Sequence, residues 1–235
     1  MQPEPDPDAA WVSALAGVSE ARARDAIGEA SRERRLFRHL DRMHRLGGRT
    51  SYIEIDAPLE LYAITRLLRP KHVVDVGVSS GVSSAYLLAA LNRNRRGTLH
   101  SVDLPSTPHR SANPRNASWS IPSGWSSGWA VPPRLRRAWD LRLGDKADVI
   151  PRLARELPRI DFVVYDVPHN ESDLVREFAS LDRRMLAGAV AIADHGPGGG
   201  RCAPLARWAR RRSSHAVRRA ELGLYGFRSG PRRRI

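Results

Sequence analysis

The sequence predicts an α/β protein with a doubly wound, mostly parallel sheet. Short apolar runs rich in β-branched residues alternate with helical patterns, and a turn rich in glycine and serine joins the first such run to a helix. Two further strand patterns stand near the end of the chain, where they predict a hairpin with an antiparallel strand. Strands that alternate with helices form a parallel sheet covered on both faces.

The N-terminal part is predicted to be helical. Residues 1–8 are acidic and rich in proline, and we expect a flexible leader. Over residues 9–48 apolar side chains recur at helical spacing in two or three segments, which end at Gly47 and Gly48. The charges of this region nearly cancel. We expect a helical cap packed on a larger core.

The alternating part spans residues 50–228, and residues 229–235 form a basic tail. Its predicted strands are 73–76, 98–103, 139–143, 161–165, 189–193, 216–222 and 224–228. Its predicted helices are 58–69, 85–91, 147–157, 171–185 and 203–212.

A long loop, residues 105–134, interrupts this alternation. Proline, serine, glycine and tryptophan dominate it, and a loop of this length is usually a lid or a binding loop. Trp119, Trp125 and Trp129 could stack on a sugar or an aromatic ring of a substrate. Packing of these tryptophans onto the core is an equally good alternative.

Composition limits the class of protein. The hydrophobic fraction is 41% and the charged fraction 27%, as in globular proteins, and no apolar run approaches the roughly 20 residues that span a bilayer. The single cysteine, Cys202, excludes an internal disulfide and a cysteine-built zinc site. The N-terminus does not resemble a signal peptide, so we expect a cytoplasmic protein.

The formal net charge of +14 by itself suggests a nucleic acid or an anionic membrane as partner. However, residues 201–235 hold eleven arginines and one acid, a net of +10, which leaves +4 for residues 1–200. Of the 39 basic residues, 37 are arginine, an excess that codon bias in a GC-rich genome explains. The charge therefore marks one basic end of the chain, whose use the sequence leaves open.

The Gly-rich turn is the first chemical signal. The stretch from Asp75 through Gly77, Ser79 and Gly81 to Ser83 leaves the first strand and opens a helix, at the edge where open α/β sheets bind ligands. Glycine lets a backbone approach a ligand, and the helix N-terminus offers free N–H groups. The stretch lacks the Gly-Lys-Ser/Thr of a Walker A loop and the spacing of a dinucleotide fingerprint. A tight structural turn is the alternative.

Acids after the next two strands fit a nucleoside ligand. Asp103 ends the second strand, where an acid can accept both hydroxyls of a ribose. Gly144 and Asp145 follow the third strand, and Asp145 can be a helix N-cap, a ligand of a purine amino group, or both.

Carboxylates and histidines also follow strands four and five. Asp166 ends the fourth strand, with His169 close behind, and Asp194-His195 ends the fifth. The carboxyl ends of parallel strands meet at one edge, so these groups could hold a divalent cation or supply a general base. The alternative is polar residues that only solvate and cap the strand ends.

In this order and at this spacing, the motifs resemble those of class I S-adenosylmethionine-dependent methyltransferases. They are most similar to the small-molecule O-methyltransferase branch, which includes catechol O-methyltransferase. The resemblance implies a Rossmann-like sheet of seven strands, mostly parallel, with an antiparallel terminal strand.

The resemblance also implies roles for single residues. The cofactor S-adenosylmethionine would be bound by Asp75, Gly77, Ser79, Gly81, Ser83, Asp103, Gly144 and Asp145. Asp166, Asp194 and His195 fall where metal-dependent members hold Mg²⁺ or another divalent cation, although the third ligand of the family is more often asparagine. Asp166, His169 and His195 are the candidate catalytic residues, and without a metal one of the two histidines would take the proton.

The implied activity is methylation of an oxygen atom on a small hydroxylated acceptor, such as a natural product, a sugar or a phenol. One alternative is an RNA methyltransferase that uses the basic C-terminal end, although the chain has no recognisable RNA-binding module. Another is a non-catalytic nucleotide-binding module. The sequence leaves the oligomeric state open, with a homodimer as one option.

Overall fold

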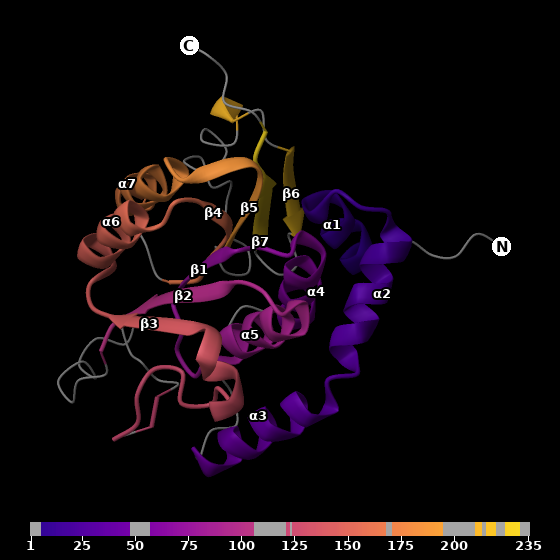
Figure 1. The fold of residues 1–235 in the computed structure, drawn as a ribbon, viewed down its shortest axis with the longest axis vertical. Helices are drawn as coiled ribbons and strands as arrows, with labels where there is room; N and C mark the ends of the chain where they lie inside the picture. Colours follow the sequence, from indigo (N-terminus) through magenta and orange to yellow (C-terminus); the bar gives the residue numbers. More distant parts are fainter. Residues whose placement is uncertain are drawn as a thin grey trace.

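A seven-stranded sheet with helices on both faces organises the computed structural model of the chain (Figure 1). The structure describes residues 6–47, 57–105, 121–122, 124–167, 171–194, 210–212, 215–219 and 224–230. The strands are β1 (His72–Val76), β2 (Thr98–Asp103), β3 (Trp139–Leu143), β4 (Ile160–Tyr165), β5 (Met185–Asp194), β6 (His215–Arg219) and β7 (Leu224–Arg228). The helices are α1 (Pro7–Ala16), α2 (Glu20–Ser31), α3 (Arg34–Leu46), α4 (Pro58–Leu68), α5 (Val82–Asn94), α6 (Lys146–Glu156) and α7 (Glu171–Asp182), with a 3₁₀ helix, η2 (Pro133–Ala138).

The strand order is β3-β2-β1-β4-β5-β7-β6, and it confirms the predicted sheet. The five strands from β3 to β5 are parallel, whereas β7 runs antiparallel to both of its neighbours. The last strand of the chain therefore lies inside the sheet, and β6 forms its edge. Because the chain turns from β3 back to β4, the order reverses between β1 and β4. In open α/β sheets that reversal marks the ligand-binding crevice.

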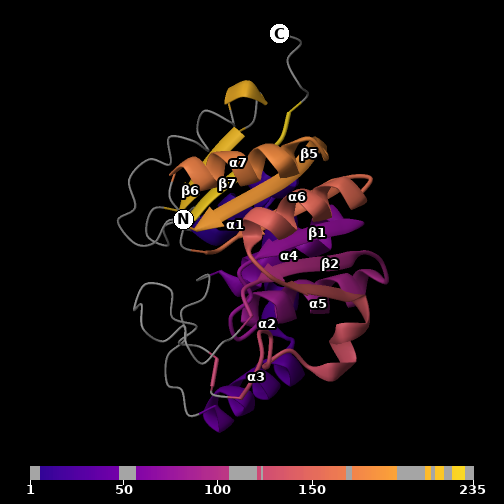
Figure 2. The same cartoon turned by 90° about the vertical axis from the view of Figure 1, so that its left-hand side faces the viewer.

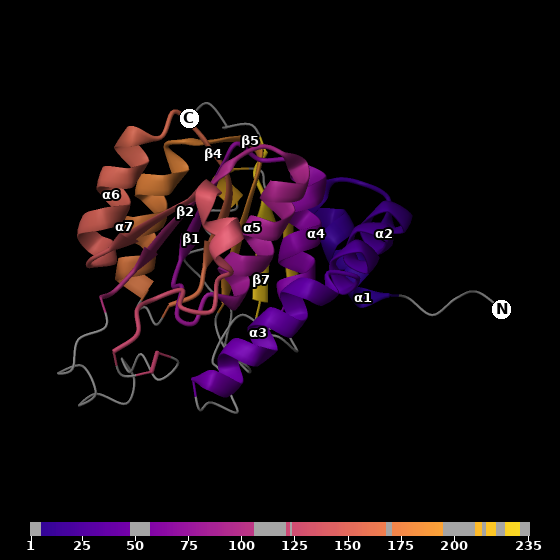
Figure 3. The same ribbon diagram turned by 60° about the horizontal axis from the view of Figure 1, so that its bottom comes forward.

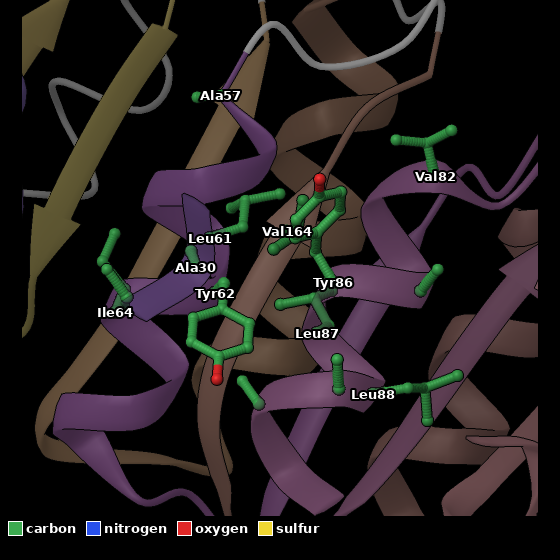
Figure 4. Packing of buried hydrophobic residues seen from close by; sticks show 14 of the residues in the cluster. Ala30, Ala57, Leu61, Tyr62, Ile64, Val82, Tyr86, Leu87, Leu88 and Val164 are labelled. Atoms are coloured by element: carbon green, nitrogen blue, oxygen red, sulfur yellow. The ribbon is translucent and has the colours of Figure 1, made fainter. Parts of the chain in front are cut away.

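The two faces of the sheet are covered by different helices, as Figure 3 shows. Along β4, Phe162 and Val164 belong to the core under α1, α2, α4 and α5, while Val163 and Tyr165 belong to the core under α6 and α7. Figure 2 views the molecule from the side of α6 and α7. Figure 4 shows the first core, where side chains of α4 and α5 interdigitate. Successive side chains of β4 thus enter opposite cores, as expected for a strand that is buried on both faces of the sheet.

The N-terminal helices differ in how closely they pack against the sheet and its covering helices. Helix α1 packs on β6 and β7, and its Trp11 and Leu15 are buried in the same core as α4 and α5. Helix α3 instead extends past the end of α5, at the lower end of the molecule in Figure 1. No helix in the described part of the chain is long and apolar enough to cross a membrane.

Most predicted elements are present within a few residues of their expected bounds. Strand β2 has the predicted bounds, and β5 begins earlier than expected, because Met185 pairs with Ile160 beyond an irregularity in the ladder. The predicted helix over 203–212 lies almost wholly outside the described residues. Only 210–212 of this range are described, and Arg210 and Arg211 are helical.

Candidate functional site

The Gly-rich turn lies at the carboxyl edge of β1, next to β2. The N–H of Gly77 donates to the carbonyl of Val102 at 2.9 Å, which ties the turn to the second strand. Gly77, Ser79 and Gly81 all have positive φ, at 97°, 52° and 93°. A left-handed backbone is unfavourable for serine, by about 1–2 kcal/mol, so the surroundings must hold Ser79 in place.

Asp103 supplies that support from the end of β2. One carboxylate oxygen accepts the N–H of Ser79 at 3.0 Å, and the other accepts the N–H of Leu104 at 2.8 Å. Each carboxylate oxygen can accept a second hydrogen bond, and the side chain is only partly buried. The structure thus brings Asp103 and the turn together, as the sequence predicted, with acceptor capacity left for a ligand.

Packing within the chain explains why glycine stands at two positions of the turn, Gly77 and Gly81. A Cβ atom on Gly77 would overlap the carbonyl oxygen of Asp166. A Cβ atom on Gly81 would lie 2.6 Å from Val131 Cγ2 and 2.9 Å from Gly128 Cα. Glycine is therefore required for close approach of the end of β4 and of residues 128–131. The contribution of these two residues to ligand binding stays a prediction.

Asp75 lies beneath the turn and is fully buried. Its Oδ2 accepts the hydroxyls of Ser84 at 2.6 Å and Ser101 at 3.1 Å, while its Oδ1 has no hydrogen-bond partner among the described residues. Burial raises the pKa of Asp75 to about 7, the two hydroxyls oppose the rise, and the nearby charge of Asp103 adds to it. The arrangement favours a cation or a hydrogen-bond donor close to Oδ1.

Gly144 and Asp145 continue the same edge. The N–H of Gly144 donates to the carbonyl of Asp103 at 2.8 Å. Asp145 is the N-cap of α6 and accepts the N–H of Ala147 at 2.8 Å, which is one of the two predicted roles. Its contact with a purine stays a prediction. Ser83 is buried in the first turn of α5.

The predicted metal-binding and catalytic residues are described in part. The N–H of Asp166 donates to the carbonyl of Val76 at 2.8 Å, which places Asp166 directly beside the Gly-rich turn. Tyr165 pairs with Ala193 across β4 and β5, so the backbones of Asp166 and Asp194 continue side by side. The side chain of Asp194, together with His169 and His195, lies outside the described residues.

The end of the long loop packs against the turn. The N–H groups of Gly128 and Ala130 donate to the carbonyls of Ser79 and Ser80, each at 2.9 Å. Trp129 is 7% exposed and contacts Trp125 edge to face, with 4.9 Å between ring centroids, so core packing is the role that the structure shows for this pair. Trp119 lies outside the described residues.

Two polar clusters escaped the sequence reasoning. Behind the sheet edge, the Lys146 ammonium contacts the buried Glu177 at 3.0 Å and donates to the Tyr165 hydroxyl at 3.0 Å, which joins α6, α7 and the end of β4. Burial, and next the hydrogen bond to Glu177, raise the pKa of Tyr165. On α3, His44 contacts Ser80 of the Gly-rich turn. Both depend on residues far apart in sequence, and no local pattern signals them.

Comparison with known proteins assigns the chain to a protein family. Solved structures of low sequence identity share the fold. The chain is 13% identical to an O-methyltransferase from Bacillus cereus in complex with SAH, with a TM-score of 0.54 over 81% of this chain and 90% of that one. It is 11% identical to SAH-bound PaMTH1, a methyltransferase from Podospora anserina, with a TM-score of 0.55 over 83% and 87%.

A third structure is the O-methyltransferase TomG from Streptomyces achromogenes, described as involved in tomaymycin synthesis and solved with SAM. It is 16% identical, with a TM-score of 0.51 over 83% of this chain and 89% of that one. No curated protein matches the sequence. The family model described as "Methyltransferase domain" matches residues 74–195, which run from β1 past the end of β5. Because this match covers more than half of the chain, the protein belongs to this methyltransferase family.

Proposed function

We propose that the protein is an S-adenosylmethionine-dependent O-methyltransferase that acts on a small hydroxylated molecule. The observation that carries the proposal is the pairing of the left-handed Ser79 with Asp103 at the carboxyl edge of β1 and β2, next to the point where the strand order reverses in a methyltransferase-family sheet. Two solved structures of the same fold are described as O-methyltransferases, one in complex with SAH and the other with SAM.

The described residues fit this cofactor. Asp103 has acceptor capacity for the two ribose hydroxyls, and Asp145 lies one strand further, where the adenine amino group would be reached. Asp75 is fully enclosed beneath the turn, so its part in cofactor binding is to support the turn from below through Ser84 and Ser101.

In methyl transfer, the main task of the protein is to align the acceptor oxygen, the methyl group and the sulfur atom. When bound, S-adenosylmethionine supplies a methyl group activated by a sulfonium, and the reaction is a direct displacement. The residues of the chain orient the cofactor, exclude water and accept the proton of the acceptor hydroxyl. We assign the proton to His169 or His195, which follow β4 and β5 in the sequence.

A divalent cation is the alternative way to activate the acceptor. Asp166 and Asp194 follow paired residues of neighbouring parallel strands, and with His195 they offer two carboxylates and an imidazole. Such a donor set suits a divalent ion, which would supply an anchor for the acceptor hydroxyl and lower its pKa.

A thermal-shift screen followed by turnover tests the proposal. We expect S-adenosylmethionine to raise the melting temperature, because ligand that binds the native state stabilises it by mass action. A panel of phenols, sugars and other hydroxylated compounds should then contain an acceptor that releases SAH. Stabilisation without turnover on any acceptor would favour a non-catalytic binding module, and turnover on RNA alone would favour the RNA methyltransferase.

A further inference from the structure

Helix α3 reaches the back of the Gly-rich turn through one buried histidine. His44 lies in the last turn of α3 and is 6% exposed. Its Nδ1 lies 2.9 Å from the carbonyl oxygen of Leu40, and its Nε2 lies 3.2 Å from the Oγ of Ser80. The imidazole also meets the ring of Trp129 edge to face, at 5.2 Å between centroids.

These partners fix the direction of the hydrogen bond to the turn. A carbonyl oxygen only accepts, so Nδ1 carries the hydrogen and donates it to Leu40. The neutral imidazole then presents a lone pair at Nε2, and the Ser80 hydroxyl donates to it. Burial lowers the pKa of His44, against the opposing effects of the Leu40 carbonyl and of Asp41, which supports the neutral form.

Ser80 is the point where a side chain can hold the turn from behind. It is fully buried, and its hydroxyl is bonded to α3. Its two neighbours, Ser79 and Gly81, both have left-handed backbones. The carbonyl of Ser80 accepts the N–H of Ala130, so the residue is held by α3 through its side chain and by the end of the long loop through its backbone.

We propose that His44 is a positioning residue for cofactor binding. By holding Ser80, it keeps the turn in the conformation in which the Ser79 N–H fixes Asp103. This inference rests on the proposed function. It assigns part of the cofactor site to α3, a helix that precedes the residues matched by the family model.

Calorimetric titration with SAH tests the inference on four single variants. His44→Leu and Ser80→Ala each remove one side of the bond, and we expect each to weaken SAH binding about three- to tenfold, the value of one neutral buried hydrogen bond. His44→Gln keeps an acceptor near the position of Nε2 and should restore most of the affinity. The double variant His44→Leu/Ser80→Ala should bind no more weakly than either single variant, because both lose the same bond.

The fourth single variant, His72→Leu, is the control. His72 is a partly buried histidine at the start of β1, and its Nδ1 lies 3.2 Å from His100 Nε2 at the amino edge of the sheet. We expect its SAH affinity to stay within about twofold of the wild type, since the contact it loses is at the opposite edge of the sheet from the turn. Melting temperatures check that each variant is folded; if His44→Leu is not, Ser80→Ala decides.

The possible outcomes separate this inference from the proposed function. Wild-type affinity in folded Ser80→Ala, or an equal loss in His72→Leu and His44→Leu, would overturn the role of His44 and leave the proposed function intact. Failure of the wild-type protein to bind SAH would overturn both.

Discussion

Asp75 is a carboxylic acid that folding places where its charge is unfavourable. It is fully enclosed between β1, β2 and α5, and its hydrogen-bond donors are the hydroxyls of Ser84 and Ser101. Ser101 in turn accepts the indole N–H of Trp139 at 2.8 Å. The result is a polar chain across three strands and one helix, directly beneath the turn that we assign to the cofactor.

This burial predicts how stability depends on pH. The pKa of Asp75 is about 7 in the folded protein and about 3.9 in an unfolded chain. The protonated Asp75 makes its full contribution to the free energy of unfolding below pH 4. As the pH rises from 4 to about 7 this contribution is lost, by at most about 1.4 kcal/mol per pH unit. Asp75→Asn removes the titration. Urea unfolding from pH 4 to 8 should therefore show the wild type losing stability relative to Asp75→Asn, with a constant difference above pH 8.

Asp25→Asn is the control for this measurement, because Asp25 is exposed on α2. Its free energy of unfolding should follow that of the wild type over the whole pH range. A difference between the wild type and Asp75→Asn that does not change with pH would contradict the buried, titrating carboxyl.

At the scale of elements, α1 is joined to the sheet by close packing. A Cβ atom on Gly226 in β7 would lie 2.6 Å from Leu15 Cδ1, and the guanidinium of Arg228 donates to the carbonyl of Leu15 at 3.1 Å. Leu15 is fully buried. The helix thus shares one core with the methyltransferase sheet.

A pair of core variants tests that packing. Gly226→Ala should destabilise the protein by about 1–3 kcal/mol through overpacking, and Leu15→Ala by about 2–5 kcal/mol through a cavity. In the double variant the added methyl group fills part of the cavity, so the loss should be smaller than the sum by about 1 kcal/mol or more. Urea denaturation of the four proteins measures this. Strict additivity would mean that Leu15 and Gly226 are not in contact.

The ends of β4 and β5 decide between the two ways of activating the acceptor. If Asp166, Asp194 and His195 hold a divalent ion, treatment with EDTA should abolish methyl transfer, and Mg²⁺ or Mn²⁺ should restore it. Asp166→Asn should then raise the metal concentration required for half-maximal activity. Full activity after EDTA treatment would rule out the metal and favour proton transfer to a histidine.

The sequence could predict those features of the fold and site that depend on neighbouring residues. Apolar runs set the strands, and the Gly-rich turn and Asp103 were found because each stands at a strand end. The contact between His44 and Ser80 could not be predicted, since it depends on where α3 lies in space. The need for glycine at position 81 could not be predicted either, because the contacting residues, Gly128 and Val131, stand near the end of a long loop without a periodic pattern.

For the whole molecule, part of the basic charge serves the fold. Arg212 is 3% exposed, forms an ion pair with Asp182 and donates to the carbonyl of Met185 at 2.8 Å. Arg228 binds the end of α1. These two are among the eleven arginines of residues 201–235, so the charge of that end is not wholly available to a partner. Helix α3, whose last turn contacts the candidate site, carries five further exposed arginines.

The central claim is that the carboxyl edge of β1 and β2 binds S-adenosylmethionine through Asp103. Isothermal titration of SAH into the wild type, Asp103→Ala and the exposed control Asp25→Ala tests it most directly. We expect the wild type and Asp25→Ala to bind alike, and Asp103→Ala to bind more weakly by about 1.5–3 kcal/mol, the value of hydrogen bonds to a charged group. No binding by the wild type, or equal affinity in Asp103→Ala, would contradict the claim.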